Sequence, residues 1–159
     1  MNRASTETLV KNHEGLRFTV YYDIEGHPTI GIGFNLDKEG ARDRITAVHA
    51  NYDRICAGEA LTESQVSALF AIDLEDAIQD ATGLVANFAD HPDPIQSVII
   101  DMIFNLGSTG FAKFEKTIAA FERKDYSTAA AQMADSKWAE QVPNRAREDI
   151  DIVMGFCHV

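Results

Sequence analysis

Apolar residues recur at helical spacing over most of this chain and alternate with polar ones along only one short stretch. Residues 5–13 carry an apolar side behind a Ser-Thr pair, which predicts a short capped helix. Over residues 18–22 the apolar positions fall on every second residue, as in a strand. Residues 25–28 then have turn composition, and residues 29–33 are predicted to return as the second strand of a hairpin.

Helical spacing dominates the remainder of the sequence. Asp37 is expected to cap a helix over residues 38–50, and residues 52–60 are expected to form a connection. Residues 62–65, Thr-Glu-Ser-Gln, form a capping-box sequence that opens a long helix ending by Gly83. The other predicted helices span residues 95–106, 114–123, 127–134 and 143–154.

The helix over residues 95–106 is apolar on more than one side, so it should lie at the centre of a helical core. Asp93 followed by Pro94 is expected to open it, and Gly107 with Gly110 to stop it. One small early sheet among many helices gives the fold class α+β, mostly α.

Charge and hydropathy exclude several functions. The 159 residues carry a formal net charge of −11, and residues 63–159 hold 16 of the 25 acidic side chains. Nucleic-acid binding needs a basic surface, so it is not expected. No stretch approaches the roughly 18 apolar residues of a membrane span, and the N-terminus lacks an apolar signal core. We expect synthesis in the cytoplasm without a signal peptide and no membrane insertion.

Cysteines and histidines suggest no further chemistry. Cys56 and Cys157 are far apart in the sequence and are expected to be free thiols, with a disulfide left open. The five histidines are scattered without the spacing of metal ligands. We therefore predict neither a metal site nor a cofactor.

Two carboxylates and a hydroxyl stand in the pattern E-x8-D-x5-T, as Glu14, Asp23 and Thr29. Glu14 precedes Gly15 at a predicted helix end, where the helix dipole disfavours its charge. A raised pKa there would suit a proton donor. By residue type alone, an acidic side chain near a turn is usually a solvated charge.

Several separated motifs reach beyond these three residues. They are residues 14–17 (EGLR), 21–23 (YYD), 25–26 (EG), 29–33 (TIGIG), 61–63 (LTE), 104–107 (FNLG), 109–110 (TG) and 143–146 (PNRA), with Leu69, Phe70, Asp73, Phe114, Trp138 and Gln141. In this order they resemble the phage-type lysozymes, glycoside hydrolase family 24. The resemblance covers nearly the full chain and is weakest over residues 37–60 and after Arg147.

The resemblance implies a single lysozyme-like domain, residues 1–159, with a two-lobed fold. An N-terminal lobe with the hairpin sheet would span about residues 14–62. A long helix over about 62–82 would join it to a helical C-terminal lobe, residues 83–159. The first helix, residues 5–13, would pack on that second lobe.

The resemblance also implies an N-acetylmuramidase that cleaves the β-1,4 bond between N-acetylmuramic acid and N-acetylglucosamine in peptidoglycan. Glu14 would be the general acid, Asp23 would stabilise the developing positive charge and help activate water, and Thr29 would hold that water. The family inverts, which requires space for the water between the carboxyl groups.

Further residues are assigned by resemblance alone. Arg145 would orient Glu14 but would also lower its pKa, and a purely structural ion pair is an equal alternative. Asp73 is expected to be a solvated charge, because Phe34 stands where the family has a histidine partner. The expected saccharide contacts are Asn35, Phe104, Asn105, Thr117 and Gln132.

Other functions remain open at this stage. A lytic transglycosylase would rely on one glutamate, and a glycan-binding module would use the fold without turnover. As an enzyme, a monomer acting on peptidoglycan strands is expected to serve as a phage endolysin released through a holin. An antibacterial effector delivered by a secretion system is the alternative, and the acidity would oppose approach to anionic walls.

Overall fold

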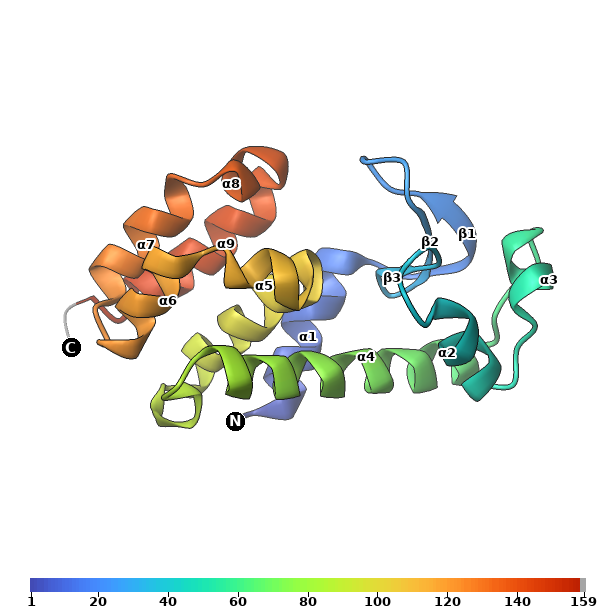
Figure 1. Ribbon diagram of the computed structural model, residues 1–159, viewed down its shortest axis with the longest axis horizontal. Coiled ribbons are helices and arrows are strands. Elements are labelled where there is room, and N and C mark those ends of the chain that lie inside the picture. Colours follow the sequence, from blue (N-terminus) through green and yellow to red (C-terminus); the bar gives the residue numbers. More distant parts are fainter. Residues whose placement is uncertain (158–159) are drawn as a thin grey trace. The chain divides into compact units, whose positions relative to one another are not determined.

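The computed structural model describes residues 1–157 (Figure 1). The strands are β1 (Arg17–Tyr22), β2 (Pro28–Gly31) and β3 (Phe34–Asn35). The helices are α1 (Arg3–Glu14), α2 (Ala41–Ala47), α3 (Tyr52–Cys56), α4 (Glu63–Leu84), η1 (Phe88–Asp90), α5 (Asp93–Ala112), α6 (Glu115–Glu122), α7 (Tyr126–Ala134), α8 (Lys137–Gln141) and α9 (Pro143–Met154). The α+β, mostly helical class is confirmed.

The chain divides into two compact units. One comprises Lys11–Asp76 and holds the sheet, α2, α3 and the first part of α4. The other comprises Met1–Val10 together with the chain from Ala77 onward, and it holds α5 to α9. Helix α1 therefore contributes its first turns to the helical unit and its last turn to the sheet unit.

The predicted hairpin is confirmed and gains a third strand. β1 pairs antiparallel with β2, with Tyr21 opposite Thr29, and β2 pairs antiparallel with β3, with Ile30 opposite Phe34. Gly26, at φ 84°, turns the first hairpin and donates its N–H to the Asp23 carbonyl over 2.9 Å. β3 has only two residues, which is too short for an alternating pattern to reveal.

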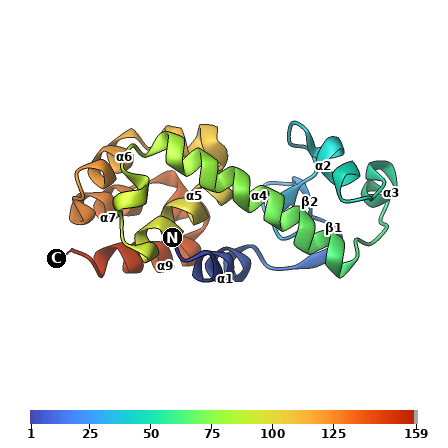
Figure 2. The ribbon, with the colours of Figure 1, turned by 90° about the horizontal axis from the view of Figure 1, so that it is seen from below.

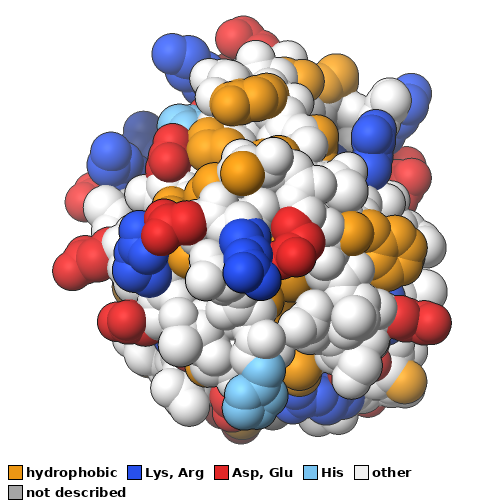
Figure 3. All heavy atoms as spheres, turned by 90° about the vertical axis from the view of Figure 1, so that its right-hand side faces the viewer, with side chains coloured by type: hydrophobic (Ala, Val, Ile, Leu, Met, Phe, Trp, Pro, Cys, Tyr) orange, Lys and Arg blue, Asp and Glu red, His pale blue; other side chains and the backbone are white. Residues whose placement is uncertain are grey.

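The apolar side of β1 faces outward. Phe18 and Tyr22 in β1 are 41% and 71% exposed, Leu16 and Ile24 on either side of the strand are 52% and 83% exposed, and Val20 in its middle is half-buried. Apolar side chains lie among charged ones on the face that Figure 3 shows. The core of the sheet unit comes instead from residues after β1, including Ile30, Phe34 and Ile45.

The segment between the sheet and α4 differs from the prediction. α2 begins at Ala41 after Gly40, which has φ 78°, so Asp37 does not cap it. The Asp37 N–H instead binds the Asn35 Oδ1 over 2.8 Å. The expected connection over residues 52–60 contains α3, which Asn51 caps by accepting the Arg54 N–H. In this segment, hydrogen bonds from backbone N–H groups to the side chains of Asn35 and Asn51 form local turns in place of the longer predicted helix.

The capping box at the start of α4 is confirmed. The Thr62 Oγ1 accepts the Gln65 N–H over 3.1 Å, and the Gln65 Oε1 accepts the Thr62 N–H over 2.9 Å. These reciprocal bonds satisfy two backbone donors that the first turn of the helix leaves without partners. The helix then runs one residue beyond Gly83, to Leu84.

Asp73 on α4 is buried rather than solvated, so that expectation was wrong. Its side chain is 8% exposed, and its Oδ1 accepts a hydrogen bond from the Lys38 Nζ over 3.1 Å. The Lys38 ammonium also lies 4.2 Å from the centroid of the Phe34 ring. Burial raises the pKa of Asp73 above its ordinary value, and Lys38 opposes that rise. Phe34 therefore helps to position Lys38, which is the partner of Asp73 in this protein.

Replacing Lys38 by Met should destabilise the protein by about 1–3 kcal/mol at neutral pH, because it leaves a buried carboxylate without its cation. The pKa of Asp73 exceeds its unfolded value, so wild-type stability falls as pH rises from the unfolded to the folded pKa. Lys38→Met raises the folded pKa further, and its deficit should therefore grow with rising pH. Urea unfolding at a series of pH values measures this.

Arg42→Met is the matched control for that prediction. Arg42 pairs with Asp53 over 3.0 Å, but both side chains are largely exposed. An exposed ion pair contributes little, so the control should unfold close to the wild type at every pH. Equal losses for the two variants would show that Asp73 gains nothing particular from Lys38.

Helix α5 forms the core of the helical unit, as predicted, with Ile95, Val98 and Ile99 fully buried. Gly107, at φ 74° and ψ 165°, is not helical and divides α5 into two helical segments across a kink, so it ends the first segment as predicted, whereas the second continues past Gly110 to Ala112. Pro92 rather than Asp93 stands at the N-cap position. Within residues 1–157, α5 alone is long and apolar enough to span a membrane, and 56% of its most apolar window is buried, as in a core helix.

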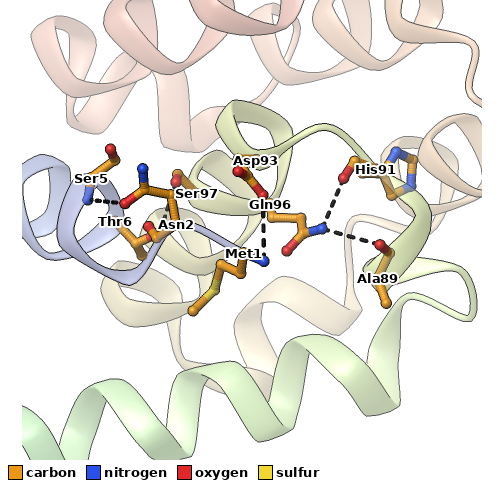
Figure 4. Close-up of polar contacts among 9 residues, drawn as sticks. All are labelled: Met1, Asn2, Ser5, Thr6, Ala89, His91, Asp93, Gln96 and Ser97. Carbon is orange, nitrogen blue, oxygen red and sulfur yellow. Dashed lines mark hydrogen bonds and ion pairs between the residues drawn. The ribbon is translucent and has the colours of Figure 1, made fainter.

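The start of the chain is hydrogen-bonded to α5 (Figure 4). The hydroxyls of Thr6 and Ser97 lie 2.7 Å apart, and both side chains are buried. Gln96, the residue before Ser97 in α5, donates its amide N–H groups to the carbonyls of Ala89 and His91. These bonds anchor residues 1–10 and the loop before α5 to one helix.

The remaining helices complete the unit, with α7 packed against both α6 and α9 (Figure 2). The predicted helices near α6, α7 and α9 are confirmed, and α8, with five residues, was not predicted. Ser136 caps α8 by accepting the Ala139 N–H over 3.2 Å. Cys56 and Cys157 are free, as expected.

Candidate active site

Glu14 is the last residue of α1, at the predicted helix end. Gly15 follows at φ 73°, and its N–H donates to the Lys11 carbonyl over 2.9 Å. A left-handed glycine at this position is a common way of ending a helix. The Glu14 carboxylate therefore stands at the negative end of the α1 dipole.

Gly33 lies directly against the Glu14 side chain. A Cβ atom added to Gly33 would overlap the carboxyl group of Glu14. Gly33 also has φ 67°, a conformation that favours glycine. The loop between β2 and β3 thus packs on the Glu14 carboxyl group, which brings the end of α1 to the sheet.

The turn after β1 fixes the carboxylate of Asp23. Its Oδ1 accepts the backbone N–H of Glu25 over 2.9 Å and that of His27 over 2.8 Å. The Asp23 N–H donates in turn to the His27 carbonyl over 3.0 Å. The side chain is half-buried, so a local turn orients a carboxylate that solvent still reaches.

Thr29 lies on β2 opposite Tyr21, with its side chain 5% exposed. Its hydroxyl donates to the His27 carbonyl over 3.0 Å. A hydroxyl has one hydrogen to give and two lone pairs to offer. Toward a water molecule, Thr29 can therefore act as an acceptor.

Tyr21 was missed as a site residue by the sequence analysis. Burial raises the pKa of its hydroxyl, the charge of Glu14 raises it next, and the charge of Asp23 adds to the rise. Arg17 opposes this effect, and its guanidinium lies 5.1 Å from the Tyr21 ring centroid. The pKa of Tyr21 therefore responds to the charges of both Glu14 and Asp23. Its position in the YYD motif was the available signal.

Arg145 belongs to the helical unit, on α9, and is 8% exposed. Its Nη2 and Nε donate to the two carboxylate oxygens of Asp101 over 2.8 and 3.0 Å. The same Nη2 donates to the Asp101 backbone carbonyl over 3.1 Å. Such bidentate pairing fixes the plane of a guanidinium.

The sequence matches a known protein family over most of its length. The family model described as phage lysozyme matches residues 11–148, which is most of the chain. This chain belongs to the phage lysozyme family. It is therefore a glycoside hydrolase, and its substrate class is peptidoglycan.

Individual relatives of this phage lysozyme differ in length. A probable T4-type lysozyme of Dictyostelium discoideum is 28% identical over 161 residues, covering 94% of each chain. The endolysin of Salmonella phage P22 is 28% identical over 126 residues, covering 77% of this chain and 74% of its own. The pre-baseplate central spike protein of Enterobacteria phage T4 is 30% identical over 160 residues, which are 94% of this chain but 28% of that protein.

The expected saccharide contacts of the lysozyme lie on several elements. Asn35 is half-buried on β3 in the sheet unit, and the other four are in the helical unit. Phe104 and Gln132 are half-buried, Asn105 is exposed, and Thr117 is only 2% exposed. The Asn105 Oδ1 accepts the Trp138 Nε1–H over 2.8 Å, which leaves its amide N–H groups directed elsewhere.

Proposed function

We propose that this phage lysozyme is an N-acetylmuramidase that uses Glu14 as its general acid on the β-1,4 bond between N-acetylmuramic acid and N-acetylglucosamine. The observation that carries the proposal is the packing of the Glu14 carboxyl group against Gly33, at the end of α1. The negative end of the α1 dipole disfavours a charge at this position, which suits a residue that must give up a proton.

The other two residues of the motif supply the second half of the reaction. Asp23, oriented by two backbone N–H groups, stabilises the oxocarbenium-like charge and helps deprotonate water. Thr29, whose hydrogen is already donated to His27, accepts a hydrogen bond from that water. An inverting reaction of this kind calls for carboxyl groups about 6.5–9.5 Å apart.

Arg145 acts in this proposal by orienting Glu14, as the family resemblance implies. A lone guanidinium would lower the pKa of the acid and weaken it as a proton donor. Asp101 neutralises Arg145 through two hydrogen bonds, which reduces that effect. Paired with Asp101, the Arg145 guanidinium can donate a directional hydrogen bond to Glu14 while the pair as a whole carries little positive charge.

Four of the five proposed saccharide contacts have side chains that solvent reaches. Phe104 offers an aromatic face to a sugar ring, and the amide N–H groups of Asn105 can reach sugar oxygens while its Oδ1 binds Trp138. Asn35 and Gln132 are half-buried and offer similar amide groups. Thr117 is buried, so a contact between its side chain and a sugar would require the largest movement of the surrounding residues.

Mass spectrometry of muropeptides released from purified peptidoglycan tests the bond and the reaction. The proposal expects reducing N-acetylmuramic acid ends, and nuclear magnetic resonance should show inversion at the anomeric carbon of the first product. Anhydro-muramic ends would identify a lytic transglycosylase instead. Binding to the glycan with no product at all would identify a non-catalytic binding module.

We further propose that the enzyme serves as a monomeric phage endolysin that reaches the wall from the cytoplasm through a holin. The similarity to the P22 endolysin, 28% identity over 77% of this chain, supports this role. Expression in a bacterium should cause lysis only when a holin is supplied. Lysis of neighbouring cells through a secretion system, without a holin, would favour the antibacterial effector, and retention in membranes would contradict a lysozyme that does not insert.

A further inference from the structure

The helical unit contains a buried carboxyl group that the proposed mechanism does not use. Asp149, on α9, is 0% exposed, and neither of its carboxylate oxygens receives a hydrogen bond from a donor among the described residues. Asp101, on α5, is also 0% exposed, and the two side chains approach with oxygens within 4.8 Å of each other. A buried ionised carboxylate in such surroundings would be costly.

Arg145 can neutralise only one of these two carboxylates. It binds both oxygens of Asp101, at 2.8 and 3.0 Å, and the Asp101 carbonyl at 3.1 Å. If Asp149 were also ionised, burial and the charge of Asp101 would oppose its charge, and Arg145 would offset them only in part. Neighbouring carboxylates in this situation share a proton between them.

The hydrogen bonds identify which carboxyl group carries the proton. Asp101 accepts from the guanidinium at both oxygens and is therefore the ionised partner. Burial raises the pKa of Asp149 to about 11, and the charge of Asp101 adds to the rise. A protonated Asp149 has one O–H, which Asp101 can accept, and a hydrogen bond with Asp101 contributes to the raised pKa of Asp149.

We propose that Asp149 is a neutral acid that donates its proton in a hydrogen bond to Asp101 and thereby holds the Asp101–Arg145 pair in the orientation needed for catalysis. Arg145 and Asp149 are four residues apart on α9, so they occupy the same side of that helix. Asp149 is thus a positioning residue that acts through Asp101 on Arg145. This inference rests on the proposed role of Arg145 beside Glu14.

The role of the proton can be separated from the shape of the side chain. Asp149→Asn keeps a donor for Asp101 and removes the titratable group, whereas Asp149→Leu keeps a similar size and removes the donor. We expect Asn to retain turnover within about threefold of wild type and Leu to lose about tenfold or more in kcat, since displaced catalytic groups lose rate steeply. KM should change little in either variant.

Asp151 supplies the matched controls, because it is an exposed aspartate on the same helix. Asp151→Asn and Asp151→Leu should both match wild-type kcat. Thermal unfolding of all four variants identifies any loss that comes from unfolding. If Asp149→Leu is folded and as active as Asp151→Leu, or if Asn loses as much kcat as Leu, the positioning role is wrong.

Infrared difference spectroscopy tests the proton without using activity. Wild type at mildly alkaline pH should show the C=O band of a protonated carboxyl group, with a shift in heavy water, and Asp149→Asn should lack it. Absence of the band in wild type would overturn the proposal. Failure of wild type to cleave peptidoglycan would overturn the proposed function instead, and the band would still decide whether Asp149 carries a proton.

Discussion

Glu14→Gln should lower turnover on peptidoglycan by about 10²–10⁴-fold, the contribution expected of a general acid. Glutamine keeps the shape that packs against Gly33 but has no proton of suitable acidity to give. Its stability should lie within about 1 kcal/mol of wild type, because the change also removes charge from the negative end of α1. Muropeptide release and thermal unfolding on the same preparations measure the two effects.

Glu39→Gln is the matched control for this variant. Glu39 is an exposed glutamate of the same unit, outside the proposed site, and carries the same charge before substitution. It should retain wild-type turnover and stability. If Glu14→Gln kept more than a few per cent of wild-type turnover, Glu14 would not be the acid.

Local signals explain the parts of the fold that could be predicted. The alternation along β1, the glycine after α1 and the capping box before α4 each depend on residues within a few positions, and all three are found. β3, α3 and α8 have two to five residues, too few for a periodic pattern to stand out.

Burial of charge was harder to predict, because it depends on residues distant in sequence. The cation that pairs with buried Asp73 is Lys38, which lies 35 positions earlier in the sequence. The residues around Asp73 in the sequence therefore suggested a solvated side chain. Asp149 did carry a local signal that was not used. It shares the inward side of α9 with Arg145, Ala146 and Val153, at positions one helical repeat apart.

In the candidate site, too, some features follow from the local sequence and others only from packing. The spacing of Glu14, Asp23 and Thr29, together with the resemblance, predicts the proposed chemistry from the sequence alone. The effect of both carboxylates on Tyr21, and the contact of Gly33 with Glu14, depend on how the hairpin packs against the end of α1. A motif states which residues occur, and the packing of the sheet decides which of them touch.

Gly33→Ala should lower turnover by about 10²-fold, although it alters no proposed catalytic group. Its Cβ would overlap the Glu14 carboxyl group, so the acid must move or the loop must shift. A displacement of about 1 Å can cost a factor of this size. The left-handed φ of 67° adds about 1–2 kcal/mol of destabilisation for a residue with a side chain.

Gly31→Ala separates displacement of the acid from backbone strain. Gly31 has almost the same φ, 66°, but the first atom its added Cβ would meet is a methyl group of Val66 at an ordinary 3.7 Å. Both variants should therefore unfold at lower denaturant concentration, while only Gly33→Ala should lose kcat in proportion to the misplaced acid. Because the two glycines differ chiefly in what lies over them, equal losses of kcat would mean that strain in the hairpin, and not contact with Glu14, controls activity.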